Sequence, residues 1–326
     1  MKAYDVLIVG GGIIGAMTAR ELSRYQLKVL VIEKAADLGE GATKANSGIL
    51  YAGFHPRGGS LKGLSCVGGN AMYVEICEEL GVPMRRTGSL YVAFHPEGEE
   101  TLRDKYKKGL KNGTPDMAII SGEEARRMEP LLNKRVRLAL YAPTTAIISP
   151  FALVWAVSRS AVQNGVEFAF DTELLGLKPE AEGFRAMTNQ GEIQARFVVN
   201  AAGENADLVE GWLYPQDLEI MPRRGEYLIF DKQKQETVRH VLYQAPETDE
   251  GGTLLAPTVD GNLIAGPTSF NVANFGRKET SWAGLKHVER VARKLVPELD
   301  MGQVIANFAG VRANITNIDK ERKDFV

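Results

Sequence analysis

Apolar and polar positions at the start of the chain follow first a strand pattern and then a helix pattern. Tyr4 to Val9 is a short apolar run rich in β-branched residues, typical of a strand buried on both faces of a parallel sheet. A glycine-rich turn and a helical pattern to about Tyr25 follow, and Lys28 to Glu33 is a second apolar strand. This order predicts a βαβ unit with two parallel strands.

In the middle of the chain, predicted helices and strands alternate again after one long loop. Residues 39–59 are rich in glycine and small side chains and have no periodicity, which predicts a long ordered loop near a ligand. A capping-box pattern at 121–124 opens a short helix that Pro130 ends. Other helices are predicted at 60–80, 97–111 and 150–164, and strands at 88–94, 166–170 and 195–202.

In the last third of the chain, the alternation of helices and strands gives way to a series of short strands. Short strands separated by turn residues, typical of an antiparallel sheet, occupy residues 223–231, 241–243, 252–256 and 262–265. An apolar stripe predicts an amphipathic helix over 281–295, formed by Trp282, Leu285, Val288, Val291 and Leu295. We therefore expect an α/β fold: a Rossmann-like domain with a parallel sheet, and a second α+β domain built on an antiparallel sheet.

Composition and charge restrict the ligands more than the fold. The 326 residues are 44% hydrophobic and 25% charged, enough for two ordinary globular domains. With 39 basic and 41 acidic side chains the net charge is -2, so we expect no nucleic-acid partner. The longest nearly apolar run, Val6 to Ala19, is shorter than the roughly 18 residues of a membrane span, so no integral membrane segment is expected. The N-terminus carries no signal-peptide pattern, which favours the cytoplasm.

The cysteines exclude some redox chemistry. Cys66 and Cys77 are the two cysteines of the sequence, and they form no C-x-x-C pair for zinc or an iron-sulfur cluster. No group of residues has metal-ligand spacing, so no metal is expected. Any redox activity must therefore come from a bound organic cofactor.

A dinucleotide motif stands between the first strand and the first helix. Gly10 permits a tight turn, Gly12 lets the backbone approach a pyrophosphate, and Gly15 allows close packing of helix and strand. Glu33, at the end of the second strand, is placed to bind a ribose and would repel a 2′-phosphate. A glycine-rich turn with a solvated Glu33 is the alternative interpretation. The motif does not separate FAD from NAD, because both present adenosine diphosphate to it.

Further segments resemble one known family. They are residues 43–49 (TKANSGI), 59–62 (GSLK), 77–83 (CEELGVP), 198–203 (VVNAAG), 223–227 (RRGEY), 257–262 (PTVDGN), 266–268 (GPT) and 310–312 (GVR). Together these segments are similar to the D-amino-acid-oxidase-type superfamily of FAD-dependent oxidoreductases. Within it they resemble the branch of glycerol-3-phosphate and L-2-hydroxyglutarate dehydrogenases.

The resemblance implies FAD as cofactor, bound in an extended form with its ring between two discontinuous domains. Residues 1–84, 146–218 and 307–326 would form the FAD-binding domain, and residues 85–145 and 219–306 the substrate domain. The cofactor contacts implied in this way, together with those of the motif, are Gly10, Gly12, Ile13, Ile14, Gly15, Glu33, Lys34, Thr43, Asn46, Ser47, Gly48, Val166, Ala202 and Gly203.

The resemblance also implies hydride transfer from a substrate H–C–OH carbon to the flavin, which passes electrons to a quinone, a partner redox protein or oxygen. Arg312 is our first choice to hold a phosphate or carboxylate of a small anionic substrate. His55 is the candidate general base, because its ordinary pKa of about 6.5 suits proton transfer. Tyr51, where the family commonly has histidine, and Tyr227 are the alternatives. Arg223 and Arg224 alternate on one strand, so at most one of the two faces the pocket.

Three functions follow from these residues. The first is oxidation of sn-glycerol 3-phosphate by an FAD-dependent dehydrogenase. The second replaces the substrate by a 2-hydroxy acid such as L-2-hydroxyglutarate, oxidised by a dehydrogenase or oxidase, because Arg312 suits phosphate and carboxylate equally. The third is a non-catalytic nucleotide-binding fragment. It is considered because the sequence stops at Val326, where family members continue through a glycine-rich turn and a helix, which predicts a C-terminal truncation.

Overall fold

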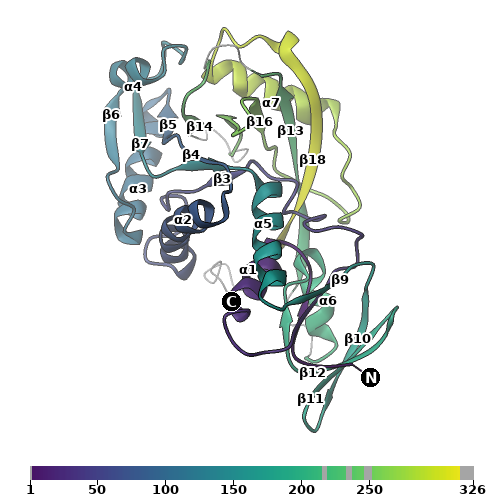
Figure 1. The fold of residues 1–326 in the computed structure, drawn as a ribbon. Coiled ribbons are helices and arrows are strands. Elements are labelled where there is room, and N and C mark those ends of the chain that lie inside the picture. Colours follow the sequence, from purple (N-terminus) through teal and green to yellow (C-terminus); the bar gives the residue numbers. More distant parts are fainter. Residues whose placement is uncertain (1, 215–218, 233–236, 246–251, 316–326) are drawn as a thin grey trace.

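The computed structural model describes residues 2–214, 219–232, 237–245 and 252–315. Three sheets and seven α-helices are found in this part of the chain. Figure 1 shows a smaller sheet at the end of the molecule that carries the N-terminus and a larger sheet at the other end, with α5 and α1 between them. The predicted α/β class with a parallel and an antiparallel sheet is confirmed.

The smaller sheet contains the predicted βαβ unit. Its strand order is β10, β11, β12, β1, β2, β9, and β12, β1, β2 and β9 are parallel neighbours. The antiparallel strands β10 and β11 extend it on one side. Its strands are β1 (Lys2–Val9), β2 (Val29–Ile32), β9 (Glu167–Ala169), β10 (Leu174–Glu180), β11 (Gly183–Thr188) and β12 (Gly191–Asn200).

Helices α1 (Ile13–Leu22), α5 (Pro150–Gln163) and α6 (Ala206–Gly211) and the 3-10 turn η1 (Gly203–Asn205) lie against this sheet or at the ends of its strands. Helix α2 (Leu61–Leu80) packs instead against α5 and α3. α1 and α5 pack side by side. Below them lies an apolar core of Val6, Ile8, Ala19, Val29, Val31, Ala161 and Val166. α1 ends at Leu22, before the predicted end near Tyr25, because the chain turns there and the Leu27 amide bonds to the Tyr25 carbonyl.

The larger sheet has nine strands, and all its neighbouring strands are antiparallel except β14 and β5. The nine strands are β5 (Ser89–Ala93), β6 (Ala118–Ser121), β7 (Leu138–Ala142), β13 (Ile220–Phe230), β14 (Val241–Gln244), β15 (Leu254–Pro257), β16 (Leu263–Gly266), β17 (Phe270–Asn271) and β18 (Val304–Ile315). The remaining helices are α3 (Pro96–Asn112), α4 (Gly122–Met128), α7 (Trp282–Leu295) and the 3-10 turn η2 (Met301–Gln303). A third, small sheet contains β3 (Ile49–Leu50), β4 (Met84–Arg86) and β8 (Ala146–Ile148).

β18 departs from the expected domain boundary after residue 306. It pairs with β13 along its whole length, from Val304 opposite Phe230 to Ile315 opposite Ile220. Residues 307–315 therefore belong by hydrogen bonding to the larger sheet, although the strand also reaches the smaller one (Figure 1). Residues 316–326 lie outside the described part, and the division into domains stays a prediction.

The amphipathic helix α7 is confirmed, with one correction. Val288 and Leu295 are fully buried against the larger sheet. Trp282 instead is 77% exposed, and the Lys286 ammonium lies 4.8 Å from the centroid of its ring. The stripe fails there because Trp282 is the first residue of the helix, next to the cap Ser281, whose amide and hydroxyl are held by Glu226. Among the residues that the structure describes, no helix is long and apolar enough to cross a bilayer.

Candidate functional site

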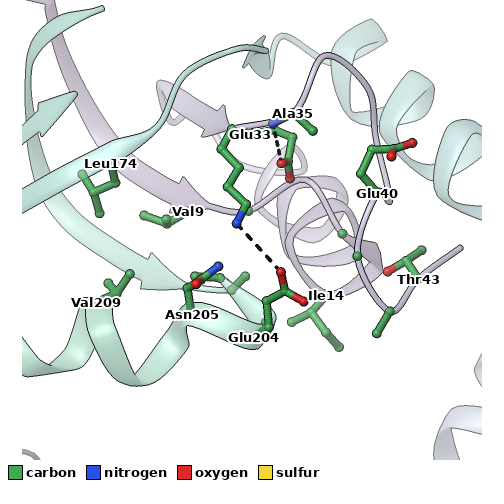
Figure 2. A pocket seen from close by; sticks show the side chains of 18 of the residues that line it. Val9, Ile14, Glu33, Ala35, Glu40, Thr43, Leu174, Glu204, Asn205 and Val209 are labelled. Carbon is green, nitrogen blue, oxygen red and sulfur yellow. Dashed lines mark hydrogen bonds and ion pairs between the residues drawn. The ribbon is translucent and has the colours of Figure 1, made fainter. Parts of the chain in front are cut away.

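A cavity of about 770 Å³ lies at the carboxyl ends of the parallel strands β1, β2 and β12. This edge of an α/β sheet is where the loops after the strands leave room for a ligand. Figure 2 shows Glu33 and Ala35 at the end of β2 across the cavity from Glu204 and Asn205, with Ile14 and Thr43 to one side. Val311 and Ala313 of β18 also line it.

The glycine motif forms one wall of the cavity. Gly10 has a φ of +111°, and a Cβ there would lie 2.4 Å from the Ala201 carbonyl oxygen. A Cβ on Gly15 would lie 2.0 Å from the Gly10 carbonyl oxygen, so α1 can approach β1 this closely only without a side chain. Gly12 caps α1 and gives it no side-chain cap, so the positive end of the helix faces the cavity.

Glu33 lies beside the glycine motif and joins it to the end of β2. One carboxylate oxygen accepts a hydrogen bond from the Gly11 amide at 2.7 Å. The other accepts from the Ala35 amide at 2.9 Å, as Figure 2 shows. A carboxylate can accept about four hydrogen bonds, so this one still has lone pairs for ribose hydroxyls. The Lys34 ammonium lies 3.9 Å from a carboxylate oxygen of Glu204, which joins the ends of β2 and β12.

The predicted loop after residue 39 closes the cavity near α1. The Thr43 hydroxyl accepts a hydrogen bond from the Ile13 amide at 3.0 Å, so Thr43 satisfies a free amide in the first turn. Asn46 holds the loop together, because its amide group donates to the Thr43 carbonyl at 2.6 Å and its oxygen accepts from the Gly48 amide at 2.7 Å. This loop and the first turn of α1 are therefore the groups that could hold a dinucleotide pyrophosphate.

Most of the predicted cofactor contacts line this cavity, namely Gly10, Gly12, Ile13, Ile14, Glu33, Lys34, Thr43, Asn46, Ala202 and Gly203. Gly15 and Gly48 act instead in close backbone packing, and Ser47 forms a hydrogen bond with Tyr51. Val166 is a correction, because it is 4% exposed in the core below α1 and α5 and does not line the cavity.

Sequence reasoning missed several lining residues, among them Thr172, Glu173, Leu174, Leu175, Glu204, Asn205 and Trp212. The first four follow β9, and Glu204 and Asn205 follow β12. Both strands run parallel to β1 in the smaller sheet, so their carboxyl ends share the edge with β1. The strand order, which the sequence does not state, is the signal that would have found them.

β18 separates the cavity from a second group of side chains. Val311 and Ala313 face the cavity, so by strand alternation Gly310 and Arg312 face the other way. A Cβ on Gly310 would lie 2.3 Å from the Ala45 carbonyl oxygen, so the loop that leads to Tyr51 rests on this face. We call Tyr51, His55, Tyr227, Tyr243 and Arg312 the tyrosine–arginine cluster.

The cluster brings together all four predicted catalytic residues. Tyr51 and His55 have ring centroids 5.3 Å apart, and the charge of Arg312 acts on the hydroxyls of both Tyr51 and Tyr227. Desolvation raises the pKa of Tyr51, which the Ser47 hydrogen bond and the charge of Arg312 partly counteract. Burial also raises the pKa of Tyr243, whose hydroxyl has no hydrogen-bond partner among the described residues.

His55 does not have the ordinary pKa on which its choice as general base depends. Burial, with a smaller contribution from the charge of Lys105, lowers the pKa of His55 to about 3. Its ring packs against those of Phe54 and Tyr243, with centroids 4.2 and 5.0 Å away. The buried Nε2 atom has no hydrogen-bond partner in the described part of the chain. His55 is therefore neutral at physiological pH, and its Nε2 atom is left without a protein partner in the described residues.

Arg312 points to a polar group at the edge of the cluster. Its Nη2 donates to the Ser269 hydroxyl oxygen at 2.9 Å, and Arg223 Nε donates to the same oxygen at 2.7 Å. Arg224 faces the other side of β13, where it pairs with Glu226 at 3.0 Å and with Glu279 at 3.3 Å. As the alternation predicts, only one of these two consecutive arginines lies on the face of Arg312.

Residues 5–324 match the family model described as DAO, FAD dependent oxidoreductase. The glycerol 3-phosphate dehydrogenase of Caloramator mitchellensis is 39% identical over 323 residues, which cover 99% of this chain and 66% of that protein. The chain therefore spans just under two thirds of that relative. The glycerol 3-phosphate oxidase of Mycoplasma pneumoniae is 29% identical, and the match covers 100% of this chain and 86% of that protein.

More distant similarity extends to the mitochondrial L-2-hydroxyglutarate dehydrogenase of Homo sapiens, 30% identical over 82% of this chain and 61% of that protein. Among solved structures, dithionite-reduced L-α-glycerophosphate oxidase from Mycoplasma pneumoniae with FAD bound superposes with a TM-score of 0.92 at 28% identity. That comparison covers 100% of this chain and 86% of the other. The predicted truncation of this chain stays a prediction.

Proposed function

The chain belongs to the DAO family of FAD-dependent oxidoreductases, and on this premise we propose that it oxidises sn-glycerol 3-phosphate with FAD as cofactor. The substrate loses a hydride from its secondary carbinol carbon and a proton from the hydroxyl of that carbon, which gives the ketone. The relatives whose names include glycerol 3-phosphate support this choice of substrate.

The residues of the cavity fit FAD. Glu33 has free lone pairs for the adenosine ribose, and the exposed first turn of α1 and the loop at Thr43 are placed for the pyrophosphate. When bound, FAD supplies the hydride acceptor. The protein supplies binding, orientation and exclusion of water around it.

One observation carries the proposal: Arg312 and the cavity lie on opposite faces of the same short stretch of β18. A substrate whose anionic group is bound by Arg312 would place its carbinol among Tyr51, His55 and Tyr227, on the face of β18 that Arg312 occupies. The neutral His55 Nε2 and the tyrosine hydroxyls are the groups available to hydrogen-bond the reacting hydroxyl. Among them, a neutral Nε2 can accept the hydroxyl hydrogen bond in its unprotonated state.

The rival substrate is L-2-hydroxyglutarate, which the similarity to the human dehydrogenase supports. The electron acceptor, a quinone, a partner redox protein or oxygen, is a further part of the proposal that needs its own measurement. Release of peroxide during turnover would identify oxygen, and its absence with turnover on an artificial acceptor would identify one of the other two.

The test begins with the visible spectrum of the purified protein and identification of the released cofactor. Anaerobic bleaching of the flavin by sn-glycerol 3-phosphate, at lower concentration than by L-2-hydroxyglutarate, is the expected result. Arg312→Gln should then require a much higher substrate concentration for the same bleaching. Preferential bleaching by the hydroxy acid would overturn the choice of substrate. A colourless protein that takes up no added FAD would favour the non-catalytic fragment.

A further inference from the structure

Two guanidinium groups meet at one hydroxyl beside the proposed substrate. Arg223 and Arg312 are directly opposite each other on the antiparallel strands β13 and β18. Both donate to the Ser269 hydroxyl oxygen, at 2.7 and 2.9 Å. Like charges at directly opposite positions of a sheet destabilise the pairing. The fold keeps them together here without an evident structural benefit.

No described carboxylate neutralises this pair. Neither Arg223 nor Arg312 forms an ion pair with any acidic residue that the structure describes, whereas the neighbouring Arg224 pairs with both Glu226 and Glu279. The Ser269 oxygen has two lone pairs, and both are occupied by arginine donors, so its own proton is free to be donated. The three side chains therefore carry a net positive charge and have hydrogen-bond donors that are not used within the group. Both properties favour binding of an anion.

The position of the pair connects it with the reaction. Arg223 lies on the same face of β13 as Tyr227, because the two residues are four positions apart on one strand. Tyr227 stacks on Phe308, which lies on the same face of β18 as Arg312, with ring centroids 4.6 Å apart. An anion held by the two arginines would therefore direct the rest of a short molecule toward Tyr227 and Tyr51.

We propose that Arg223 is a specificity-determining residue that, with Arg312 and the Ser269 hydroxyl, binds the dianionic phosphate of a phosphomonoester. The inference rests on the proposed function and decides between its two substrates. A carboxylate offers two oxygens in one plane, which a single guanidinium satisfies in a bidentate pair. A phosphomonoester offers three terminal oxygens in three directions and a second charge, so it can bind two guanidiniums and a hydroxyl at once.

The test uses the FAD-loaded protein and three variants. Arg223→Gln keeps a donor for Ser269 but removes the charge, Arg223→Lys keeps the charge but removes the fork, and Arg277→Gln changes an exposed arginine paired with Glu279. Loss of one charged hydrogen-bonding group predicts a KM for sn-glycerol 3-phosphate about 10- to 100-fold higher in Arg223→Gln, with a smaller change in kcat. Arg223→Lys should fall between this variant and the parent, and Arg277→Gln should match the parent.

The pH profile gives a readout that a purely structural role of Arg223 would not change. A phosphomonoester takes up its second proton near pH 6, so the apparent affinity of the parent should fall below that pH. In Arg223→Gln this fall should be weaker, because one cation that prefers the dianion is gone. Inorganic phosphate should inhibit the parent competitively, and the variant about 10-fold less.

The outcomes separate this inference from the proposed function. If sn-glycerol 3-phosphate bleaches the flavin and Arg223→Gln leaves its KM and pH profile unchanged, the inference is overturned and the function stands. If no tested alcohol bleaches the flavin, binding of inorganic phosphate is measured by calorimetry on the FAD-loaded protein. Loss of that binding in Arg223→Gln but not in Arg277→Gln would then support the anion site, whereas no phosphate binding to the parent would overturn it.

Discussion

The rings of Tyr227 and Phe308 stack across strands β13 and β18, with 4.6 Å between their centroids and 5° between their planes. The two strands carry the arginine pair at one end and cross from the larger sheet toward the nucleotide cavity. The stack therefore packs the two strands together next to the substrate side of the site.

Removal of this stack should destabilise the protein more than removal of the tyrosine hydroxyl. We expect Phe308→Ala to lower the free energy of unfolding by about 2 kcal/mol, less than a fully buried phenylalanine because Phe308 is half-buried. Tyr227→Phe keeps the stacked ring and should cost less than about 1 kcal/mol. Urea unfolding of the FAD-loaded variants measures both. Equal losses would show that the stack does not hold the strands.

Glu33 should control the affinity for FAD. Its carboxylate fixes the Gly11 and Ala35 amides and leaves lone pairs for the ribose, so Glu33→Ala should raise the FAD dissociation constant about 10- to 100-fold. Glu33→Gln retains one acceptor oxygen, so its FAD dissociation constant should lie between those of the parent and Glu33→Ala. FAD titration followed by flavin fluorescence gives the constants. Glu79→Gln, an exposed position on α2, is the control that should leave the affinity unchanged.

His55 should make stability depend on pH. Its folded pKa of about 3 lies below the value near 6.5 of an unfolded histidine, so between these values the unfolded chain binds more protons. The contribution of His55 is therefore complete above pH 6.5 and is lost as the pH falls toward 3. From pH 7.5 to pH 5 the loss is about 2 kcal/mol.

Urea unfolding at the two pH values tests this expectation on the parent and on His55→Gln, which cannot titrate. The variant should lose about 2 kcal/mol less than the parent. An identical pH dependence in the parent and in His55→Gln would contradict a depressed pKa. The same low pKa predicts that no ionisation of His55 near pH 6.5 appears in the pH–rate profile.

The glycines of α1 and α2 should respond oppositely to alanine. A Cβ on Gly15 would overlap the Gly10 carbonyl, so Gly15→Ala must shift α1 and should cost about 1–3 kcal/mol. A Cβ on Gly68, inside α2, meets no atom within 4 Å, so Gly68→Ala should gain about 0.5–1 kcal/mol from helix propensity. Urea unfolding of both variants measures the two changes in the free energy of unfolding. A neutral Gly15→Ala would mean that the close approach is not required.

Features fixed by neighbours in the sequence could be predicted. The βαβ unit, the capping box at Ser121 and the glycine motif all depend on contacts within one or two adjacent elements, and the structure contains each of them. The cavity wall formed by Gly10 and Glu33 could be predicted from the sequence for the same reason. Local pattern and local stereochemistry were sufficient there.

By itself, then, the sequence determined the α/β class, the nucleotide motif and the identity of the residues at one cavity wall. Only the tertiary structure decided that Arg223 meets Arg312 at Ser269, that His55 is buried among aromatic rings, that Val166 lies in the core and that Trp282 is exposed. These properties depend on strand pairing and desolvation by segments far apart in the chain. Periodicity reports which face of an element is apolar, but not which distant element will cover it or what charge that element carries.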